Sequence, residues 1–199
     1  MDWNSVTLLP WDLILEILGF TTGLLYIWWE YHADTRLWIV SMIMPFISVW
    51  LYLDKGLYAD FAINIYYFLI AVYGYIVWSR HPGKKSENGL PIRHLTIPVA
   101  FCSLAGFIAL WTLLYCVLEY LTDSTVPVAD AFTTALSIVG MWLLAKKYIE
   151  QWIAWIAVDA VCVGLYIYKG IYLYATLYLI YTVIAFFGYF KWKRLMKQQ

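Results

Sequence analysis

Two tryptophans and an acid share one stripe of a strongly apolar segment. Trp152, Trp155 and Asp159 lie within "QWIAWIAVDAVCVGLYIY" (151–168). Their spacing of i, i+3 and i+7 places the three side chains on one face of an α-helix. A tryptophan ring attracts a cation by about 0.5–2 kcal/mol and stacks on flat rings, and a carboxylate supplies the opposite charge. The stripe therefore indicates a pocket for a flat, positively charged molecule.

Asp159 lies within an apolar segment, so its charge needs a compensating partner. An ionisable side chain inside a membrane costs roughly 2.5–3.5 kcal/mol on insertion scales, and no Lys or Arg lies in the middle of an apolar segment of this chain. The carboxylate therefore needs a proton, a bound cation or a hydrogen-bonding partner. A cationic ligand is one hypothesis; a structural acid bonded to a tyrosine or to the backbone is the alternative.

The composition is typical of an integral membrane protein. Of the 199 residues, 64% are hydrophobic and 13% are charged, whereas soluble domains have about 25% charged residues. The apolar blocks have the length of about 20 residues that crosses a bilayer as a helix, so we expect an all-α fold. The expected spans lie near residues 12–31, 37–53, 57–78, 97–120, 127–145, 151–168 and 171–190. The net charge of +0 gives no indication of a nucleic-acid partner.

The basic residues predict the orientation. All but two of the 13 Lys and Arg residues fall in segments that would be cytoplasmic if the C-terminus is cytoplasmic, and the exceptions are Lys55 and Lys169. Cytoplasmic loops carry an excess of Lys and Arg. We therefore expect seven crossings, with the N-terminus outside and the C-terminus cytoplasmic.

The two halves of the chain repeat at a constant offset of 114 residues. Between residues 18 and 80, 16 of the 63 aligned pairs are identical, including Trp38 with Trp152 and Gly74 with Gly188. This predicts a three-helix repeat at 12–80, a loop and linker helix at 81–126, and a second three-helix repeat at 127–194. Because three is odd, the linker helix makes the repeats parallel. Transporters with such repeats bind their substrate between the repeats, near the middle of the bilayer.

Stripes on four expected spans carry most of the mid-span polar and hydroxyl-bearing groups, and we expect these faces to enclose a pocket. The candidate substrate-binding residues are Asn64, Tyr67, Trp152, Trp155, Asp159, Tyr178 and Tyr181, with Asp60, Trp38 and Ser41 as further candidates. Structural alternatives remain: Trp152 as an interfacial aromatic, Asn64 as an interhelical hydrogen bond, and Asp60 as a solvated acid. Glu30 is expected at the inner interface, and no second acid lies near Asp159 on its own stripe.

Three motifs in two segments resemble the PnuC family of bacterial vitamin transporters, which carry nicotinamide riboside. The segments are "KGLYADFAINIYYFLIAVYGYIVW" (55–78) and "WIAWIAVDAVCVGLYIYKGIYLYATLYLIY" (152–181). The motifs are W-x-x-W with the acid Asp159, L-Y-A-D at 57–60, and Y-G-Y-x-x-W at 73–78. The resemblance covers about residues 12–194.

The resemblance implies a fold and a mode of transport. The fold would be the 3+1+3 arrangement of the SWEET sugar carriers, assembled as a homotrimer in the bacterial inner membrane. Transport would be facilitated diffusion, and a cytoplasmic vitamin kinase would trap the vitamin by phosphorylation. From the two repeats themselves we expect uncoupled passage by rocking of one repeat on the other; coupling to an ion gradient through protonation of Asp159 is the alternative. No cofactor is implied.

The resemblance also implies roles for single residues. Trp152 and Trp155 would stack on the pyridinium ring or form a wall beside it. Asn64, where relatives are expected to have Gln, would bond the carboxamide or the ribose. The three tyrosines Tyr67, Tyr178 and Tyr181 would close the pocket and bond hydroxyl groups. Thiamine, another flat cation with a hydroxyl group, remains an alternative substrate.

Other classes of function lack their residues in this sequence. An intramembrane enzyme needs a nucleophile with a base, or a metal cluster, and the chain has no G-x-S-x-G, no H-E-x-x-H and no mid-span His. An ion channel needs rings or chains of charges, and one Asp with one Asn are too few. We therefore expect a transporter that is neither an enzyme nor a metal-binding protein.

Overall fold

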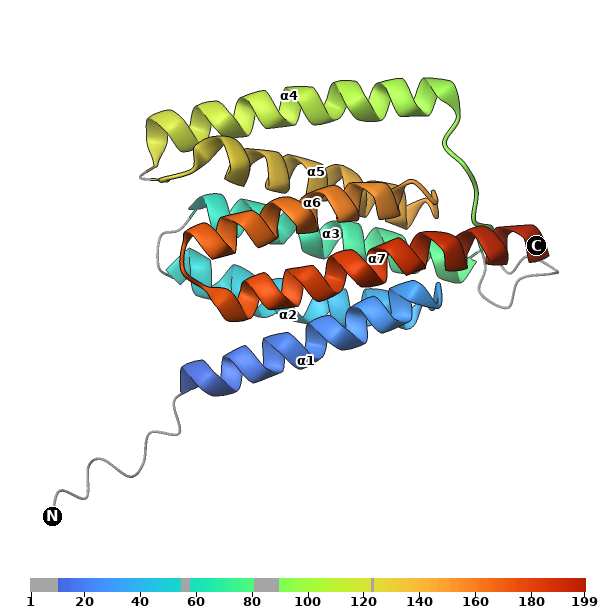
Figure 1. Cartoon of the computed structure of the whole chain (residues 1–199), viewed down its shortest axis with the longest axis horizontal. Helices are drawn as coiled ribbons and strands as arrows, with labels where there is room; N and C mark the ends of the chain where they lie inside the picture. Colours follow the sequence, from blue (N-terminus) through green and yellow to red (C-terminus); the bar gives the residue numbers. More distant parts are fainter. Residues whose placement is uncertain (1–10, 55–57, 81–89, 123) are drawn as a thin grey trace, which may run out of the picture.

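Helices make up nearly all of the computed structural model, which describes residues 11–54, 58–80, 90–122 and 124–199 (Figure 1). The helices are α1 (Trp11–Tyr31), α2 (Arg36–Asp54), α3 (Tyr58–Arg80), α4 (Ile97–Leu121), α5 (Pro127–Ala145), α6 (Gln151–Tyr168) and α7 (Tyr172–Gln198). In these ranges the only β-type pairing is an isolated bridge between Arg93 and Tyr148. The prediction of an all-α membrane fold is confirmed.

The helix boundaries follow the predicted spans closely, with one clear exception. Helix α7 continues to Gln198, eight residues beyond its predicted end at 190, because lysines and arginines end a lipid-facing stretch without ending a helix. By length and composition, five of the described helical segments are apolar enough to cross a membrane. They are Phe61–Arg80, Ile97–Leu121, Pro127–Ala145, Gln151–Tyr168 and Tyr172–Gln198. Prolines lie in the first turn of α4 and of α5. Backbone N–H groups in the first turn have no partner within the helix, so a proline there costs no helical hydrogen bond.

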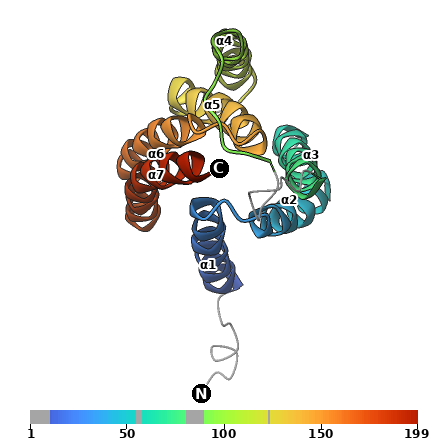
Figure 2. The same cartoon turned by 90° about the vertical axis from the view of Figure 1, so that its right-hand side faces the viewer.

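The helix contacts of the two halves correspond to each other. Helices α2 and α3 pack together as α6 and α7 do, and α1 packs on α2 as α5 packs on α6. The halves meet where α1 packs on α7 and where α3 packs on α5 (Figure 2). Two three-helix repeats would give this pattern, although the division at 12–80, 81–126 and 127–194 stays a prediction.

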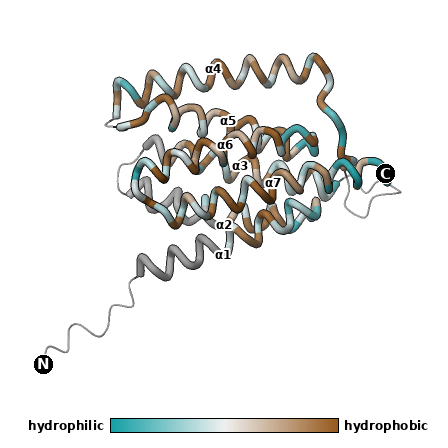
Figure 3. Tube along the Cα trace, viewed as in Figure 1, coloured by the Kyte–Doolittle hydropathy of each residue, from teal (hydrophilic) through white to brown (hydrophobic). Residues whose placement is uncertain are grey.

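Helix α4 lies on the outside of the bundle. Among the described residues it packs on α5 and on no other helix (Figure 2). None of its side chains is buried, and hydrophobic residues cover most of its length (Figure 3). Hydrophilic residues gather instead near the C-terminus and in the segment before α4. The exposed apolar surface of α4 is suited to lipid or to another subunit.

Four tryptophans form the centre of the core. Trp38 meets Trp78 edge to face, with ring centroids 5.5 Å apart and planes at 88°. Trp152 meets Trp192 in the same way, at 5.7 Å and 89°. The first pair joins α2 to α3, and the second joins α6 to α7. Trp78 and Trp192 then contact each other at 6.3 Å, which connects the two halves.

Two glycines make room for these rings. A Cβ atom at Gly74 would lie 2.5 Å from the Trp38 ring, and one at Gly188 would lie 2.7 Å from the Trp152 ring. Real Cβ atoms do not approach other atoms this closely. The absence of a side chain at both positions therefore allows α3 to approach α2, and α7 to approach α6, as small residues do at helix interfaces in membranes.

Candidate substrate site

The polar interior of the bundle is organised around Asp159 on α6. Its side chain is buried, with 5% of its surface exposed. It is close enough to interact electrostatically with Tyr26 of α1 and with Tyr178 and Tyr181 of α7. The ion pairs formed by the described residues do not include Asp159. The structure thus presents a buried carboxylate with three tyrosines within electrostatic range.

Tyrosine rings line the path from α6 to α7 and on to α1. Tyr166 stacks on Tyr178 with centroids 5.2 Å apart, and Tyr178 meets Tyr181 edge to face at 5.8 Å. The Tyr181 hydroxyl reaches α1 at Gly23, where a Cβ atom would collide with it. Two of the predicted site residues, Tyr178 and Tyr181, are therefore brought together beside Asp159.

A neighbouring pocket of about 280 Å³ lies between α1, α2, α3 and α5. It is lined by Thr22, Gly23, Tyr26, Val40, Ser41, Pro45, Tyr67 and Met141. Predicted site residues Ser41 and Tyr67 are among them. Tyr26 connects this pocket to the acid because it lines the pocket and interacts with both Tyr67 and Asp159. The pocket and the Asp159 region thus share a wall.

Trp155 lies between the core and the polar interior. Its ring is half-buried and packs over Gly140 of α5, where a Cβ atom would lie 3.6 Å away. Its indole nitrogen is buried and has no hydrogen-bond partner. A buried donor without a partner is costly, so this N–H is available to an acceptor group on a ligand.

Trp152 and Trp38 occupy equivalent places in the two halves, and both are fully buried. Their burial is inconsistent with the alternative of an interfacial aromatic for Trp152, because an interfacial ring would face lipid headgroups. Both indole nitrogens also lack a hydrogen-bond partner. Stacking of Trp152 on a substrate stays a prediction.

The remaining candidates lie on α3. Asn64 is half-buried and precedes Tyr67 by one helical turn on the same face. Asp60 falls within α3, but its side chain is outside the described residues. Contact of either residue with a substrate stays a prediction.

The predicted site omits three polar residues that lie around it: Tyr26, which is partly buried, and Glu30 and Gln151, which are buried. The sequence predicts Glu30 at the inner interface and assigns no role to Tyr26 or Gln151. In the structure Glu30 is 1% exposed and Gln151 is 0% exposed. The available signals were the i, i+4 spacing of Tyr26 and Glu30, and the i, i+4, i+8 stripe of Gln151, Trp155 and Asp159.

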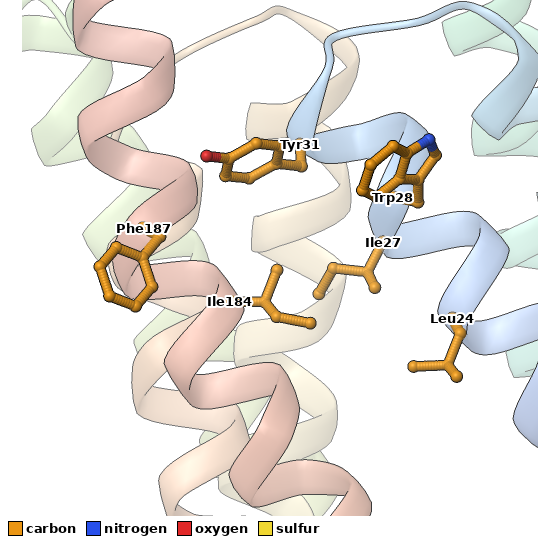
Figure 4. A pocket seen from close by; sticks show the side chains of 6 residues that line it. All are labelled: Leu24, Ile27, Trp28, Tyr31, Ile184 and Phe187. Carbon is orange, nitrogen blue, oxygen red and sulfur yellow. The ribbon is translucent and has the colours of Figure 1, made fainter.

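A larger pocket of about 470 Å³ lies between α1 and α7 and has a different character (Figure 4). Its lining is Leu24, Ile27, Trp28, Tyr31, Ile184 and Phe187. Trp28 and Phe187 are 61% and 57% exposed, so the pocket faces outward. A lining without a charged residue suits lipid chains better than it suits a cation.

Comparison with known proteins gives a consistent picture. The family model described as nicotinamide mononucleotide transporter matches residues 13–194. The nicotinamide riboside transporter PnuC of Escherichia coli (strain K12) is 27% identical, over 89% of this chain and 84% of that protein. The riboflavin/roseoflavin transporter RibM of Streptomyces davaonensis is 29% identical, over 62% of this chain and 58% of that protein.

A solved structure shares the fold. The crystal structure of the vitamin B3 transporter PnuC superimposes with a TM-score of 0.72 over 98% of this chain and 86% of that one, at 21% sequence identity. The match to the family model spans nearly the whole chain, and the fold is that of a solved member. The chain therefore belongs to the PnuC family of multi-pass bacterial membrane transporters.

Proposed function

We propose that the protein carries nicotinamide riboside into the cell. The observation that supports this substrate most directly is the buried Asp159 carboxylate, which has tyrosines around it and the half-buried ring of Trp155 on the same helical face. Nicotinamide riboside has a flat pyridinium ring, which matches the carboxylate and the indole, and a ribose, which matches the phenolic hydroxyls. A relative at 27% identity bears the name of this activity.

The mechanism that we propose is facilitated diffusion by rocking of one three-helix repeat against the other. The helix contacts support it, because the halves meet through two helix pairs, α1 with α7 and α3 with α5. The N-terminus would lie outside and the C-terminus in the cytoplasm of the inner membrane. Phosphorylation by a cytoplasmic kinase would trap the vitamin, and the exposed face of α4 supports assembly of a homotrimer.

Thiamine is the alternative substrate, because it is also a flat cation with a hydroxyl group. The relative that transports riboflavin raises a third substrate class, a flat vitamin without a positive charge. The buried acid favours the two cations over riboflavin, since a carboxylate has no charge–charge attraction to a neutral ring. Charge therefore distinguishes riboflavin from nicotinamide riboside and thiamine. The two cations share the features that the site recognises, and a binding experiment distinguishes them.

Calorimetric titration of the purified protein tests the proposal. The ligands are nicotinamide riboside, thiamine, riboflavin and uridine, the last being a neutral nucleoside with the same ribose. We expect nicotinamide riboside to bind at least tenfold more tightly than the other three. Preference for thiamine would identify the alternative, and preference for riboflavin or uridine would remove the role of charge.

A further inference from the structure

Glu30 and Gln151 meet where α1 ends and α6 begins. They are 1% and 0% exposed, and the Gln151 amide and the Tyr26 hydroxyl lie next to the Glu30 carboxylate. The two side chains face each other, but the contact is imperfect, because Glu30 Oε1 and both polar atoms of the Gln151 amide lack a hydrogen-bond partner of good geometry. An acid and an amide are thus buried together with unused hydrogen-bonding capacity.

Packing alone does not require polar groups at these two positions. The residues 114 positions away are Leu144 for Glu30 and Leu37 for Gln151, and both leucines are fully buried with 0% exposed. The fold therefore fills the corresponding places in the other half with leucine. A buried polar group that is left without a partner costs about 1–3 kcal/mol, so the Glu30–Gln151 pair is a feature that packing alone does not account for.

The pair belongs to the same interior as Asp159. The carboxyl groups of Glu30 and Asp159 are close enough to interact electrostatically. Gln151 and Asp159 lie on one stripe of α6 and are eight residues apart, which is about 12 Å along a helix. The polar interior therefore extends from Asp159 to the end of the bundle that bears the C-terminus (Figure 1).

We propose that Glu30 and Gln151 form a second binding site for the positively charged substrate, between Asp159 and the cytoplasmic face. This inference rests on the proposed function. The Glu30 carboxylate would attract the cationic ring as it leaves Asp159. The Gln151 amide, with one donor group and one acceptor group, would bond the carboxamide or a ribose hydroxyl. Because Glu30 also attracts the cation, it lowers the free energy needed to move the cation away from Asp159.

The test replaces the pair by its leucine counterpart, in the double variant Glu30→Leu/Gln151→Leu. The matched control is Asp34→Asn, which removes an acid in the loop after α1. This acid lies four residues from Glu30 and pairs with Arg36 at the start of α2. Both variants and the wild type are reconstituted in liposomes, and the saturated initial rate of nicotinamide riboside uptake is measured. Affinity is measured by calorimetry, and folding by thermal melting in detergent.

We expect the double variant to melt at or above the wild-type temperature, to bind nicotinamide riboside within threefold of wild type, and to transport it at least tenfold more slowly. The single variant Glu30→Gln, which keeps the shape and loses the charge, should also slow uptake. The Asp34→Asn variant should match the wild type. Uptake by the double variant within twofold of wild type would overturn the inference, and so would loss of folding, because the pair would then be structural.

A second measurement uses the unmodified chain. A carbodiimide labels carboxyl groups inside membrane proteins, and mass spectrometry assigns the labelled residue. Saturating nicotinamide riboside should slow labelling of Glu30 as well as Asp159, and unchanged labelling of Glu30 would overturn the second site. Failure of the wild type to bind nicotinamide riboside at all would instead overturn the proposed function, so the two failures are distinguishable.

Discussion

The Trp192 indole nitrogen donates a hydrogen bond of 2.9 Å to the backbone carbonyl oxygen of Glu30. This bond joins α7 to the last turn of α1. Trp78, 114 residues earlier, donates in the same way to the carbonyl oxygen of Ala145 at the end of α5, at 3.1 Å. Each tryptophan thus holds the end of a helix of the other half, and both bonds are buried.

Removing either bond should destabilise the protein. In Trp192→Phe and Trp78→Phe the ring is smaller and the N–H donor is lost, so we expect a loss of about 1–3 kcal/mol in each. Thermal melting in detergent measures it. Trp28→Phe is the control, because that ring is 61% exposed. Equal melting shifts in all three variants would contradict a role for the two buried bonds.

The glycines beneath the tryptophan rings should be intolerant of a methyl group. In Gly188→Ala the new Cβ would lie 2.7 Å from the Trp152 ring, so we expect the melting temperature and the yield of folded protein to fall, with Gly74→Ala behaving likewise. Gly106→Ala is the matched control, since nothing lies within 4 Å of a Cβ there. That control should be neutral or gain up to about 1 kcal/mol from helix propensity. Normal folding of Gly188→Ala would mean that α6 and α7 do not pack as described.

The charge of Asp159 should determine affinity for the cation. In Asp159→Asn the shape is kept and the charge is lost, so we expect nicotinamide riboside to bind at least tenfold more weakly. Binding of uridine should not change. Asp130→Asn is the control, because that acid already has a cationic partner, Lys169, at 3.4 Å. Equal affinities of the wild type and Asp159→Asn for nicotinamide riboside, measured by calorimetry, would contradict a role for the Asp159 charge in binding the cation.

Trp155 should contribute through its ring. Trp155→Ala removes the aromatic face, and we expect affinity for nicotinamide riboside to fall more than tenfold, while Trp155→Phe should recover part of it. Trp111→Ala is the control, since that residue packs at the outer interface of α4 and α5. If Trp155→Ala binds as the wild type does, Trp155 only packs.

Lys147 should make stability depend on pH. It lies in the loop between α5 and α6, and burial lowers its pKa from 10.5 to about 8. Below pH 8 both folded and unfolded states carry the proton, so the cost of the buried charge is present in full. Between pH 8 and 10.5 the unfolded state holds more protons, and stability must rise with pH, by at most about 1.4 kcal/mol per unit.

Melting curves of the wild type and of Lys147→Met measure this effect. The Lys147→Met variant has no charge to bury, so we expect it to be more stable than the wild type at pH 7. The variant also loses the contact between Lys147 Nζ and the Trp78 ring, whose centroid is 4.2 Å away, and this loss reduces its advantage. Its advantage should shrink as pH rises from 8 to 10.5. A difference that stays constant over this range would show that Lys147 keeps its ordinary pKa.

Local features of the fold could be predicted from the sequence. The helices of the described residues follow from the length of the apolar blocks, because a bilayer of fixed thickness requires about 20 apolar residues per span. The stripe of Trp155 and Asp159 follows from helical periodicity, which depends only on spacing. The constant offset between Trp38 and Trp152 predicted that they occupy equivalent places, and their ring contacts correspond.

Contacts between distant segments could not be predicted in this way. Glu30 lies at the end of its span, where a lone helix would expose it to water, and its burial depends on α6 and α7 packing over it. The same holds for Gln151, which shares the stripe of Asp159 but lies at a helix start.

Sequence alone therefore determined which residues share a helix face, and the tertiary structure decided which faces meet. Trp152 shows the difference. Its spacing places it on one stripe with Asp159, but Gly188 and Trp192, more than thirty residues away, enclose its ring. The physical reason is that burial belongs to pairs of surfaces: a side chain is removed from lipid or water only by atoms that pack against it, and here those atoms come from another helix.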